Sequence, residues 1–243
     1  MNVYRVLRKW NLRPDKALGQ NFLVDQTILE RIAAAARLTA DDLVLEIGAG
    51  TGALTELLAR DAGHVVALEL DQQLIPILEA ELSGFDNVSV IQGDILRLDP
   101  ADLIETVDPR RGSSHPRYKV VANLPYYITS AVLRHLLESD PRPELMVITV
   151  QREVAERIVA APGDMSVLAV SVQFYGDPDL LFRIKPGSFH PSPDVESAVL
   201  RIDVHARPPL PEEEREAFFT VVRAGFSQRR KQLHNSLSAG LGE

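Results

Sequence analysis

The chain has 243 residues, of which 45% are apolar and 25% charged, a balance typical of globular proteins with room for one large α/β domain and a small appendage. The absence of cysteine excludes a disulfide framework, a thiolate metal site and a cysteine nucleophile. The formal net charge of −8 argues against a surface that is basic throughout.

The two ends of the chain nevertheless carry clusters of basic residues. Met1–Gln20 holds five basic residues and one acid, and Arg223–His234 holds four basic residues and no acid. One such cluster is usually solvated surface, but two on an acidic chain favour contacts with phosphate groups. The first ten residues lack the apolar core of a signal peptide, and no apolar run could span a bilayer, so we expect a cytoplasmic protein without a membrane partner.

Short apolar runs rich in branched side chains predict five strands, which are separated by segments with helical spacing of apolar residues. The predicted strands are Leu43–Ile47, Val65–Leu68, Val88–Ile91, Val120–Ala122 and Leu145–Val150. Strands that alternate with helices form βαβ units and a parallel sheet. Because the runs show little alternation of polar and apolar residues, we expect helices on both faces of that sheet.

The later part of the chain predicts a different arrangement. Val167–Tyr175 and Val195–Val204 are interpreted as two further strands, and the prolines between them exclude a continuous helix. Strands without a helical crossover can pair antiparallel, so we expect an antiparallel strand at or near one edge. Beyond a proline-rich linker, Glu212–Phe226 has the spacing of an amphipathic helix. The predicted fold class is α/β, with a mostly parallel, doubly wound sheet and an antiparallel edge strand.

A glycine-rich turn follows the first predicted strand. The run from Glu46 to Gly52 reads Glu-Ile-Gly-Ala-Gly-Thr-Gly and leads into a helix. Glycines let the backbone approach a ligand closely, and the helix beyond offers free N–H groups. The loop also fits a loose dinucleotide fingerprint, with Gly48, Gly50 and Ala53 as the small positions, and the plainest alternative is a tight turn.

Polar side chains end four successive predicted strands. Glu46, Glu69, Asp94 and Asn123 should share the carboxyl edge of the sheet, where open α/β sheets bind ligands. Glu69 is placed to accept hydrogen bonds from both hydroxyls of a ribose, and Asp94 could accept one from the amine of adenine. Any one of these side chains could instead cap a helix, but four in register indicate a ligand site.

The turn Asn123-Leu124-Pro125-Tyr126 has the groups needed to methylate an aromatic amine. The lone pair of such an amine is delocalised into the ring, and acceptors on its protons draw the nitrogen towards a tetrahedral shape. The Asn123 side-chain oxygen and the Leu124 carbonyl can be those acceptors, Pro125 fixes the turn, and Tyr126 can stack on the base. No carboxylate base is needed because the product cation loses its proton to water, so in-line positioning would supply most of the rate.

These residues and four further motifs resemble the ribosomal RNA small-subunit adenine dimethyltransferase family. The motifs are Gly19-Gln20-Asn21-Phe22-Leu23, Gly93-Asp94-Ile95-Leu96, Phe189-His190-Pro191-Ser192-Pro193 and Phe226-Ser227-Gln228-Arg229-Arg230-Lys231. The resemblance covers nearly the whole chain. It implies a Rossmann-like, S-adenosylmethionine-dependent methyltransferase domain over residues 1–206. A small helical C-terminal domain, shorter than is usual in the family, would follow over residues 207–243.

The resemblance also implies a role for each site residue. Asn21 and Leu23 would close over the methionine part of the cofactor, S-adenosylmethionine, and Phe189 would stack on the flipped-out target base opposite Tyr126. The implied cofactor-binding residues are Gln20, Asn21, Leu23, Gly48, Gly50, Glu69, Leu70, Asp94, Ile95 and Asn123. The implied catalytic residues are Asn123, Leu124, Pro125, Tyr126 and Phe189.

The implied reaction transfers two methyl groups to N6 of each of two adjacent adenosines near the 3′ end of 16S rRNA, in the immature small ribosomal subunit. We expect a monomer, and no metal site, because the six histidines are scattered. Enzymes that methylate an adenine of 23S rRNA and confer antibiotic resistance share most of these motifs. An assembly checkpoint factor would bind the subunit without catalysis. A DNA adenine methyltransferase would need a target-recognition domain for which the chain has no room, and a dehydrogenase would leave Asn123–Tyr126 unexplained.

Overall fold

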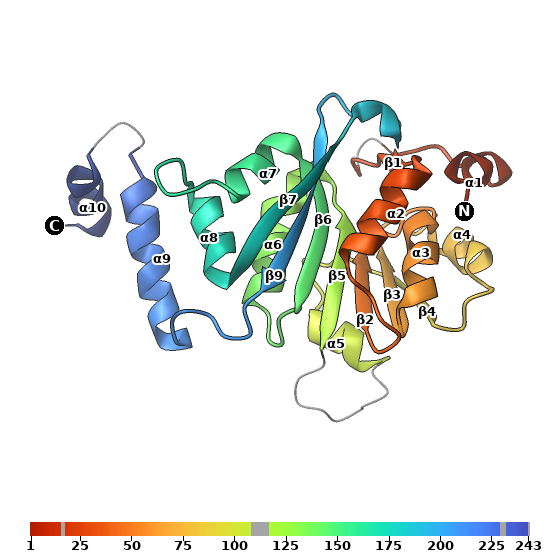
Figure 1. Cartoon of the computed structure of the whole chain (residues 1–243), viewed down its shortest axis with the longest axis horizontal. Helices are drawn as coiled ribbons and strands as arrows, with labels where there is room; N and C mark the ends of the chain where they lie inside the picture. Colours follow the sequence, from red (N-terminus) through yellow and green to blue (C-terminus); the bar gives the residue numbers. More distant parts are fainter. Residues whose placement is uncertain (16–17, 108–116, 229–231, 243) are drawn as a thin grey trace.

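Figure 1 shows the computed structural model, which describes residues 1–15, 18–107, 117–228 and 232–242. The strands are β1 (Phe22–Leu23), β2 (Leu43–Ile47), β3 (His64–Glu69), β4 (Val88–Gln92), β5 (Tyr118–Asn123), β6 (Leu145–Gln151), β7 (Gly176–Ile184), β8 (Phe189–His190) and β9 (Ser197–Val204). The α-helices are α1 (Val3–Lys9), α2 (Gln26–Ala35), α3 (Ala53–Asp61), α4 (Ile75–Glu81), α5 (Pro100–Glu105), α6 (Thr129–Glu138), α7 (Arg152–Ile158), α8 (Val167–Tyr175), α9 (Glu212–Phe226) and α10 (Leu233–Leu241). Two 3-10 turns, η1 (Tyr126–Ile128) and η2 (Pro186–Ser188), complete the described elements.

A seven-stranded sheet in the order β4-β3-β2-β5-β6-β9-β7 forms the centre of the molecule. The strands from β4 to β6 in that order run parallel, whereas β9 is antiparallel to both of its neighbours. The predicted fold class, a mostly parallel doubly wound sheet with an antiparallel edge, is confirmed, and all five predicted parallel strands are present.

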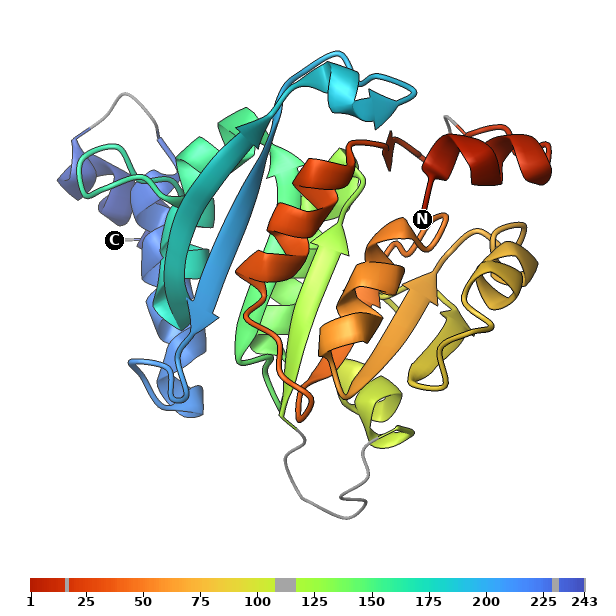
Figure 2. The ribbon, with the colours of Figure 1, turned by 45° about the vertical axis from the view of Figure 1, so that its right-hand side comes forward.

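Helices cover both faces of the sheet, as predicted (Figure 2). On one face, Leu43, Leu45 and Ile47 of β2 pack with residues of α5, α6, α7 and α8. On the other face, Val44 packs with residues of α2 and α3. Because successive side chains of a strand point to opposite faces, every residue of β2 is buried. A ligand can therefore reach β2 only beyond its ends.

The strand predicted over Val167–Tyr175 is wrong, because the structure forms helix α8 there. Branched side chains favour strands, but Ser166 caps this helix by accepting a hydrogen bond from the Ala169 N–H at 3.3 Å. The helix packs against α6 and α7, and tertiary packing overrides the weak local preference. The partner of β9 is instead β7, in the segment interpreted as a link, where Pro178 is tolerated because β7 is an edge strand.

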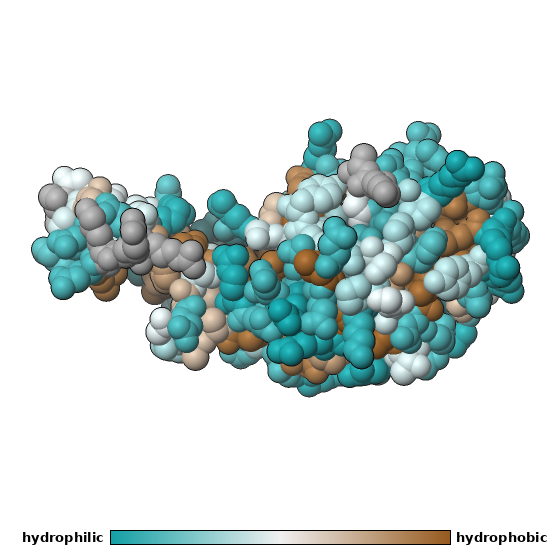
Figure 3. Space-filling model, turned by 90° about the horizontal axis from the view of Figure 1, so that it is seen from above, coloured by the Kyte–Doolittle hydropathy of each residue, from teal (hydrophilic) through white to brown (hydrophobic). Residues whose placement is uncertain are grey.

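The C-terminal helices α9 and α10 project from the α/β body (Figures 1 and 3). Helix α9 coincides with the helix predicted over Glu212–Phe226. It attaches to α8 through aromatic side chains, with the Phe218 ring stacked on Phe174 at a centroid separation of 5.0 Å. Residues 229–231 of the second basic cluster lie outside the described residues. Within the described ranges, no helix has both the length and the apolar character needed to cross a membrane.

Candidate active site

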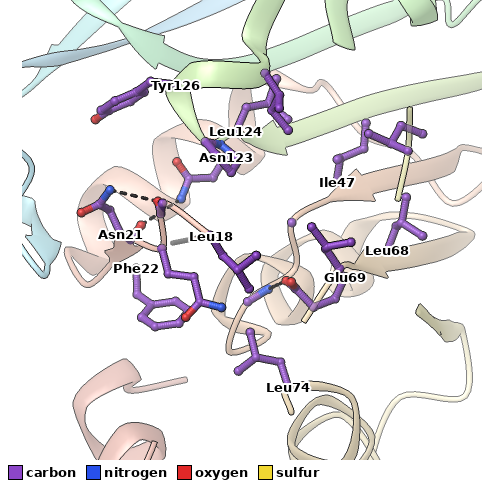
Figure 4. Close-up of a pocket in the computed structure, with 18 of the residues that line it drawn as sticks. Leu18, Asn21, Phe22, Ile47, Leu68, Glu69, Leu74, Asn123, Leu124 and Tyr126 are labelled. Atoms are coloured by element: carbon purple, nitrogen blue, oxygen red, sulfur yellow. Dashed lines mark hydrogen bonds between the residues drawn. The ribbon is translucent and has the colours of Figure 1, made fainter. Parts of the chain in front are cut away.

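The parallel strands end at a pocket that brings together residues from distant parts of the chain (Figure 4). Of the predicted site residues, Gln20, Asn21, Gly48, Gly50, Glu69, Leu70, Asp94, Ile95, Asn123, Leu124, Pro125, Tyr126 and Phe189 line it. Leu23 does not, but it borders a smaller cavity alongside. Figure 3 looks down on this side of the molecule, where hydrophobic areas show through a mostly hydrophilic surface.

Glu69, at the end of β3, holds the glycine loop in place. Its Oε2 accepts a hydrogen bond from the Gly50 N–H at 2.8 Å, and its Oε1 accepts one from the Asp71 N–H at 2.9 Å. Burial raises the pKa of the Glu69 carboxyl, and these backbone donors oppose the rise. A carboxylate oxygen can accept more than one hydrogen bond, so Glu69 retains capacity for two hydroxyl groups of a ligand.

Asp94 follows β4 and serves a local structural purpose as well as bordering the pocket. Its Oδ1 accepts a hydrogen bond from the Leu96 N–H at 3.0 Å, and its Oδ2 lies 3.4 Å from Nε of Arg97. Asp94 therefore stabilises a turn rather than capping a helix, because the next helix, α5, begins at Pro100 and is capped by Asp99. Beside Asp94, the buried Ile95 and the exposed Leu70 supply apolar walls on which a flat ring can pack.

Asn123 ends β5 at the centre of the site. Its Nδ2 donates a hydrogen bond to the main-chain oxygen of Asn21 at 3.3 Å (Figure 4). The donor end of the amide is thereby engaged, and no described residue donates to its Oδ1. The backbone of Gly48 lies close to that of Asn123. Its φ is +79°, and a Cβ there would stand 3.3 Å from the Asn123 carbonyl oxygen. Position 48 therefore needs glycine.

Residues 18–25, which we call the strap, connect the two ends of the pocket. Near one end, the Gln20 Nε2 donates to Oδ2 of Asp71 at 2.7 Å. Near the other end, β1 pairs antiparallel with β8, and Leu23 lies opposite Phe189. Next to Gln20, Gly19 has a φ of +65°, and a Cβ there would stand 3.3 Å from the Tyr127 ring. The strap thus links Asp71, Asn123 and β8 across the pocket.

Two aromatic side chains, Tyr126 and Phe189, line the pocket, and Tyr126 lies on the side away from Glu69. Phe189 is buried and Tyr126 is half-buried. The Tyr126 hydroxyl is hydrogen-bonded to Oγ of Ser197 at 2.7 Å, and burial raises the pKa of Tyr126. Figure 4 shows Tyr126 and Glu69 at opposite sides of the drawn residues. The pocket therefore has a polar end, built around a carboxylate and backbone N–H groups, and an aromatic end.

Glu46 lies beneath the pocket rather than in its wall. Its side chain is 1% exposed, it borders the smaller cavity together with Leu23 and Asn123, and its Oε2 has no hydrogen-bond partner among the described residues. Burial raises the pKa of Glu46 to about 8, and the nearby Glu69 carboxylate adds to the rise. Burial therefore keeps Glu46 neutral at pH 7, and Glu46 does not line the pocket with Glu69, Asp94 and Asn123 as the sequence predicted.

The burial of Glu46 predicts how the stability of the protein depends on pH. The folded protein keeps the Glu46 proton up to about pH 8, whereas the unfolded chain releases it near 4.5, so the free energy of unfolding falls as pH rises through that window. Glu46→Gln should remove this fall, a difference of at most about 5 kcal/mol between the ends of the window. Urea unfolding at pH 5, 6.5 and 8 measures it, with the exposed Glu79→Gln as control. Parallel pH curves for the wild type and Glu46→Gln would contradict it.

Sequence reasoning missed the apolar part of the pocket. The additional lining residues are Leu18, Phe22, Ile47, Leu68, Leu74, Tyr127 and Ile128. An apolar residue that lines a pocket has the same spacing as one in the core, so the sequence carried no separate signal for them. Within the part of the chain that the structure describes, no cluster of three or more His, Asp or Glu side chains could hold a metal ion.

An S-adenosylmethionine-dependent methyltransferase is the class that this sheet order and site define, and solved structures agree with it. The 23S rRNA methyltransferase ErmE superposes with a TM-score of 0.75 at 31% identity, covering 90% of this chain and 84% of that one. A dimethyladenosine transferase from Plasmodium falciparum gives a TM-score of 0.77 at 27% identity, covering 91% of this chain and 77% of that one.

Sequence comparison defines the group more narrowly. Residues 11–243 match the family model of ribosomal RNA adenine dimethylase. The ribosomal RNA small subunit methyltransferase A of Pelotomaculum thermopropionicum is 46% identical, over 99% of this chain and 83% of that protein. The protein of that name from Dehalococcoides mccartyi strain 195 is 44% identical, over 98% and 79%. This chain therefore belongs to the ribosomal RNA adenine dimethylase family, and it is a methyltransferase whose cofactor is S-adenosylmethionine.

Proposed function

We propose that this protein transfers two methyl groups to N6 of each of two adjacent adenosines near the 3′ end of 16S rRNA, acting as a monomer on the immature small ribosomal subunit in the cytoplasm. Relatives that carry the small-subunit name, at 44% and 46% identity, support that choice of RNA. The observation that carries the chemistry is the Asn123 amide, whose Nδ2 is engaged by Asn21 while its Oδ1 is left for a ligand.

The residues present fit the cofactor. The Glu69 carboxylate has capacity for ribose hydroxyls, Leu70 and Ile95 offer apolar surfaces for adenine, and Asp94 stands beside them for its amine. The bare backbone at Gly48 leaves the room that a side chain would fill. Bound there, S-adenosylmethionine would supply an electrophilic methyl group.

The chain's own residues would then present the target amine. Oδ1 of Asn123 and the Leu124 carbonyl would accept hydrogen bonds from the amine protons, which localises the lone pair on nitrogen. Tyr126 and Phe189 would hold the base between their rings. Once methylated, the amine would lose its extra proton to water. Positioning of the two reactants accounts for most of the rate.

The position and charge of the N-terminal helix α1 favour binding of RNA beside the aromatic end of the pocket. The Tyr4 ring lies 5.4 Å from the His190 ring, so α1 stands next to the strand that carries Phe189. The positive charges of α1 are partly balanced, because Lys9 lies 2.5 Å and Arg5 3.8 Å from the Glu81 carboxylate. Both basic side chains remain more than half exposed and are available to phosphates.

Methyl transfer to purified subunits tests the proposal. The protein would be incubated with labelled S-adenosylmethionine and undermethylated small subunits, with large subunits and duplex DNA as parallel substrates. We expect dimethyladenosine from the small subunit alone, approaching four methyl groups per subunit. Label confined to large-subunit RNA would instead support the alternative, a 23S rRNA methyltransferase. The 31% identity to ErmE is the observation that favours this alternative. Binding of small subunits without transfer would support the checkpoint role.

A further inference from the structure

The strand β9 carries a buried hydroxyl that the reaction as described does not use. Ser197 is 0% exposed and does not line the pocket, yet its Oγ is hydrogen-bonded to the Tyr126 hydroxyl at 2.7 Å. The two residues are 71 positions apart and come from different elements, the turn η1 and the first residue of β9. The bond therefore ties a wall of the pocket to the sheet.

Ser197 is held more firmly than the residue it contacts. It pairs with Gln151 of β6 on one side and with Ile184 of β7 on the other. Next to it, the Glu196 main-chain oxygen accepts a hydrogen bond from the Arg152 N–H at 2.9 Å. Tyr126, by contrast, lies in a short 3-10 turn without a side-chain cap. Ser197 begins the strand that pairs with both β6 and β7, so its hydroxyl can anchor the Tyr126 ring.

The same stretch of chain also carries Phe189, the second aromatic residue of the proposed base site. Phe189 lies eight positions before Ser197, and β8 is fixed against the strap by its pairing with β1. The segment 189–197 thus carries one aromatic ring directly and holds the other through a hydrogen bond. The distance between the two rings is the dimension that decides whether a flat base fits.

We propose that Ser197 is a positioning residue for target-base capture: its hydroxyl fixes the Tyr126 ring opposite Phe189 and so sets the width of the slot for an adenine. The inference rests on the proposed function, because it takes the base to enter between these rings. Since Ser197 lies away from Glu69 and the glycine loop, its loss should weaken productive binding of RNA and leave cofactor binding unchanged.

Two variants remove the same hydrogen bond from its two sides. Tyr126→Phe keeps the ring and loses the hydroxyl, and Ser197→Ala loses the other partner. Each should lower kcat/KM for undermethylated small subunits about tenfold, mainly through KM, because one buried hydrogen bond is lost. The Kd for S-adenosylmethionine should stay within twofold. The double variant should also lose about tenfold rather than a hundredfold, since both changes break one interaction.

A matched control separates positioning from general damage. Tyr118→Phe removes another tyrosine hydroxyl, which donates to the Pro141 oxygen at 3.2 Å from the far end of β5. It should lower the melting temperature about as much as Tyr126→Phe but leave kcat/KM unchanged. The inference is overturned if both site variants keep kcat/KM within twofold, if their effects multiply in the double variant, or if cofactor affinity falls with them. A wild-type protein that fails to methylate small subunits would overturn the proposed function instead.

Discussion

Asn123→Ala should lower kcat for methyl transfer by about two to three orders of magnitude, with the Kd for S-adenosylmethionine raised no more than about tenfold. The alanine removes the proposed side-chain acceptor for the target amine, so the lone pair of that amine would stay delocalised. It also removes the bond from Nδ2 to the Asn21 oxygen, so the strap loses one of its contacts. Single-turnover transfer to undermethylated small subunits and calorimetric cofactor binding measure the two quantities.

Asn123→Asp separates the acceptor from the contact with the strap. The carboxylate still offers an oxygen to the amine but meets the Asn21 carbonyl with like polarity. We expect it to transfer methyl groups at least about tenfold faster than Asn123→Ala and slower than the wild type. Equal rates for Asn123→Ala and the wild type would rule out Asn123 as the acceptor. If small-subunit binding persists in Asn123→Ala while transfer is lost, binding and catalysis are separable functions of this protein.

Glu69→Ala should raise the Kd for S-adenosylmethionine about a hundredfold. The change removes the proposed acceptor of the two ribose hydroxyls, and it also leaves the Gly50 N–H and the Asp71 N–H without their partner. The glycine loop therefore loses its support at the same time as the ligand loses its contacts. Calorimetry or equilibrium dialysis with S-adenosylhomocysteine measures the affinity without turnover.

Glu69→Gln tests the reason for this effect. The amide presents one oxygen and one nitrogen to two backbone N–H donors, so one donor must face another donor. Its affinity should fall nearly as far as that of Glu69→Ala, whereas Glu79→Ala, an exposed acid on α4, should bind as the wild type does. Retained affinity in Glu69→Gln would mean that hydroxyl binding needs only one oxygen and that the loop is supported elsewhere.

Much of this architecture followed from local patterns. Five apolar runs predicted the parallel strands because a strand buried on both faces must be apolar on both sides. The polar residues that end these runs predicted the edge at which Glu69, Asp94 and Asn123 meet, since parallel strands all end on the same side. Their assignment to cofactor and substrate remains a prediction. The helix α8 was mistaken for a strand because branched residues are favourable in strands and α8 is stabilised by its neighbours rather than by its own composition.

By itself, therefore, the sequence determined the fold class, the family and the chemical types of the residues along the carboxyl edge, because these depend on short-range periodicity and on motifs that are contiguous in the chain. Only the tertiary structure decided which of these side chains are charged and which are fixed by hydrogen bonds to distant residues. Glu46 lies opposite Ala67, two positions short of the level of Glu69, and its complete burial keeps it neutral at pH 7. The Tyr126 side chain is hydrogen-bonded to Ser197, which is 71 positions away. The Asn123 side chain is hydrogen-bonded to Asn21, which is 102 positions away. Burial and contacts of that range arise only when the whole chain is packed, so no local pattern could have predicted them.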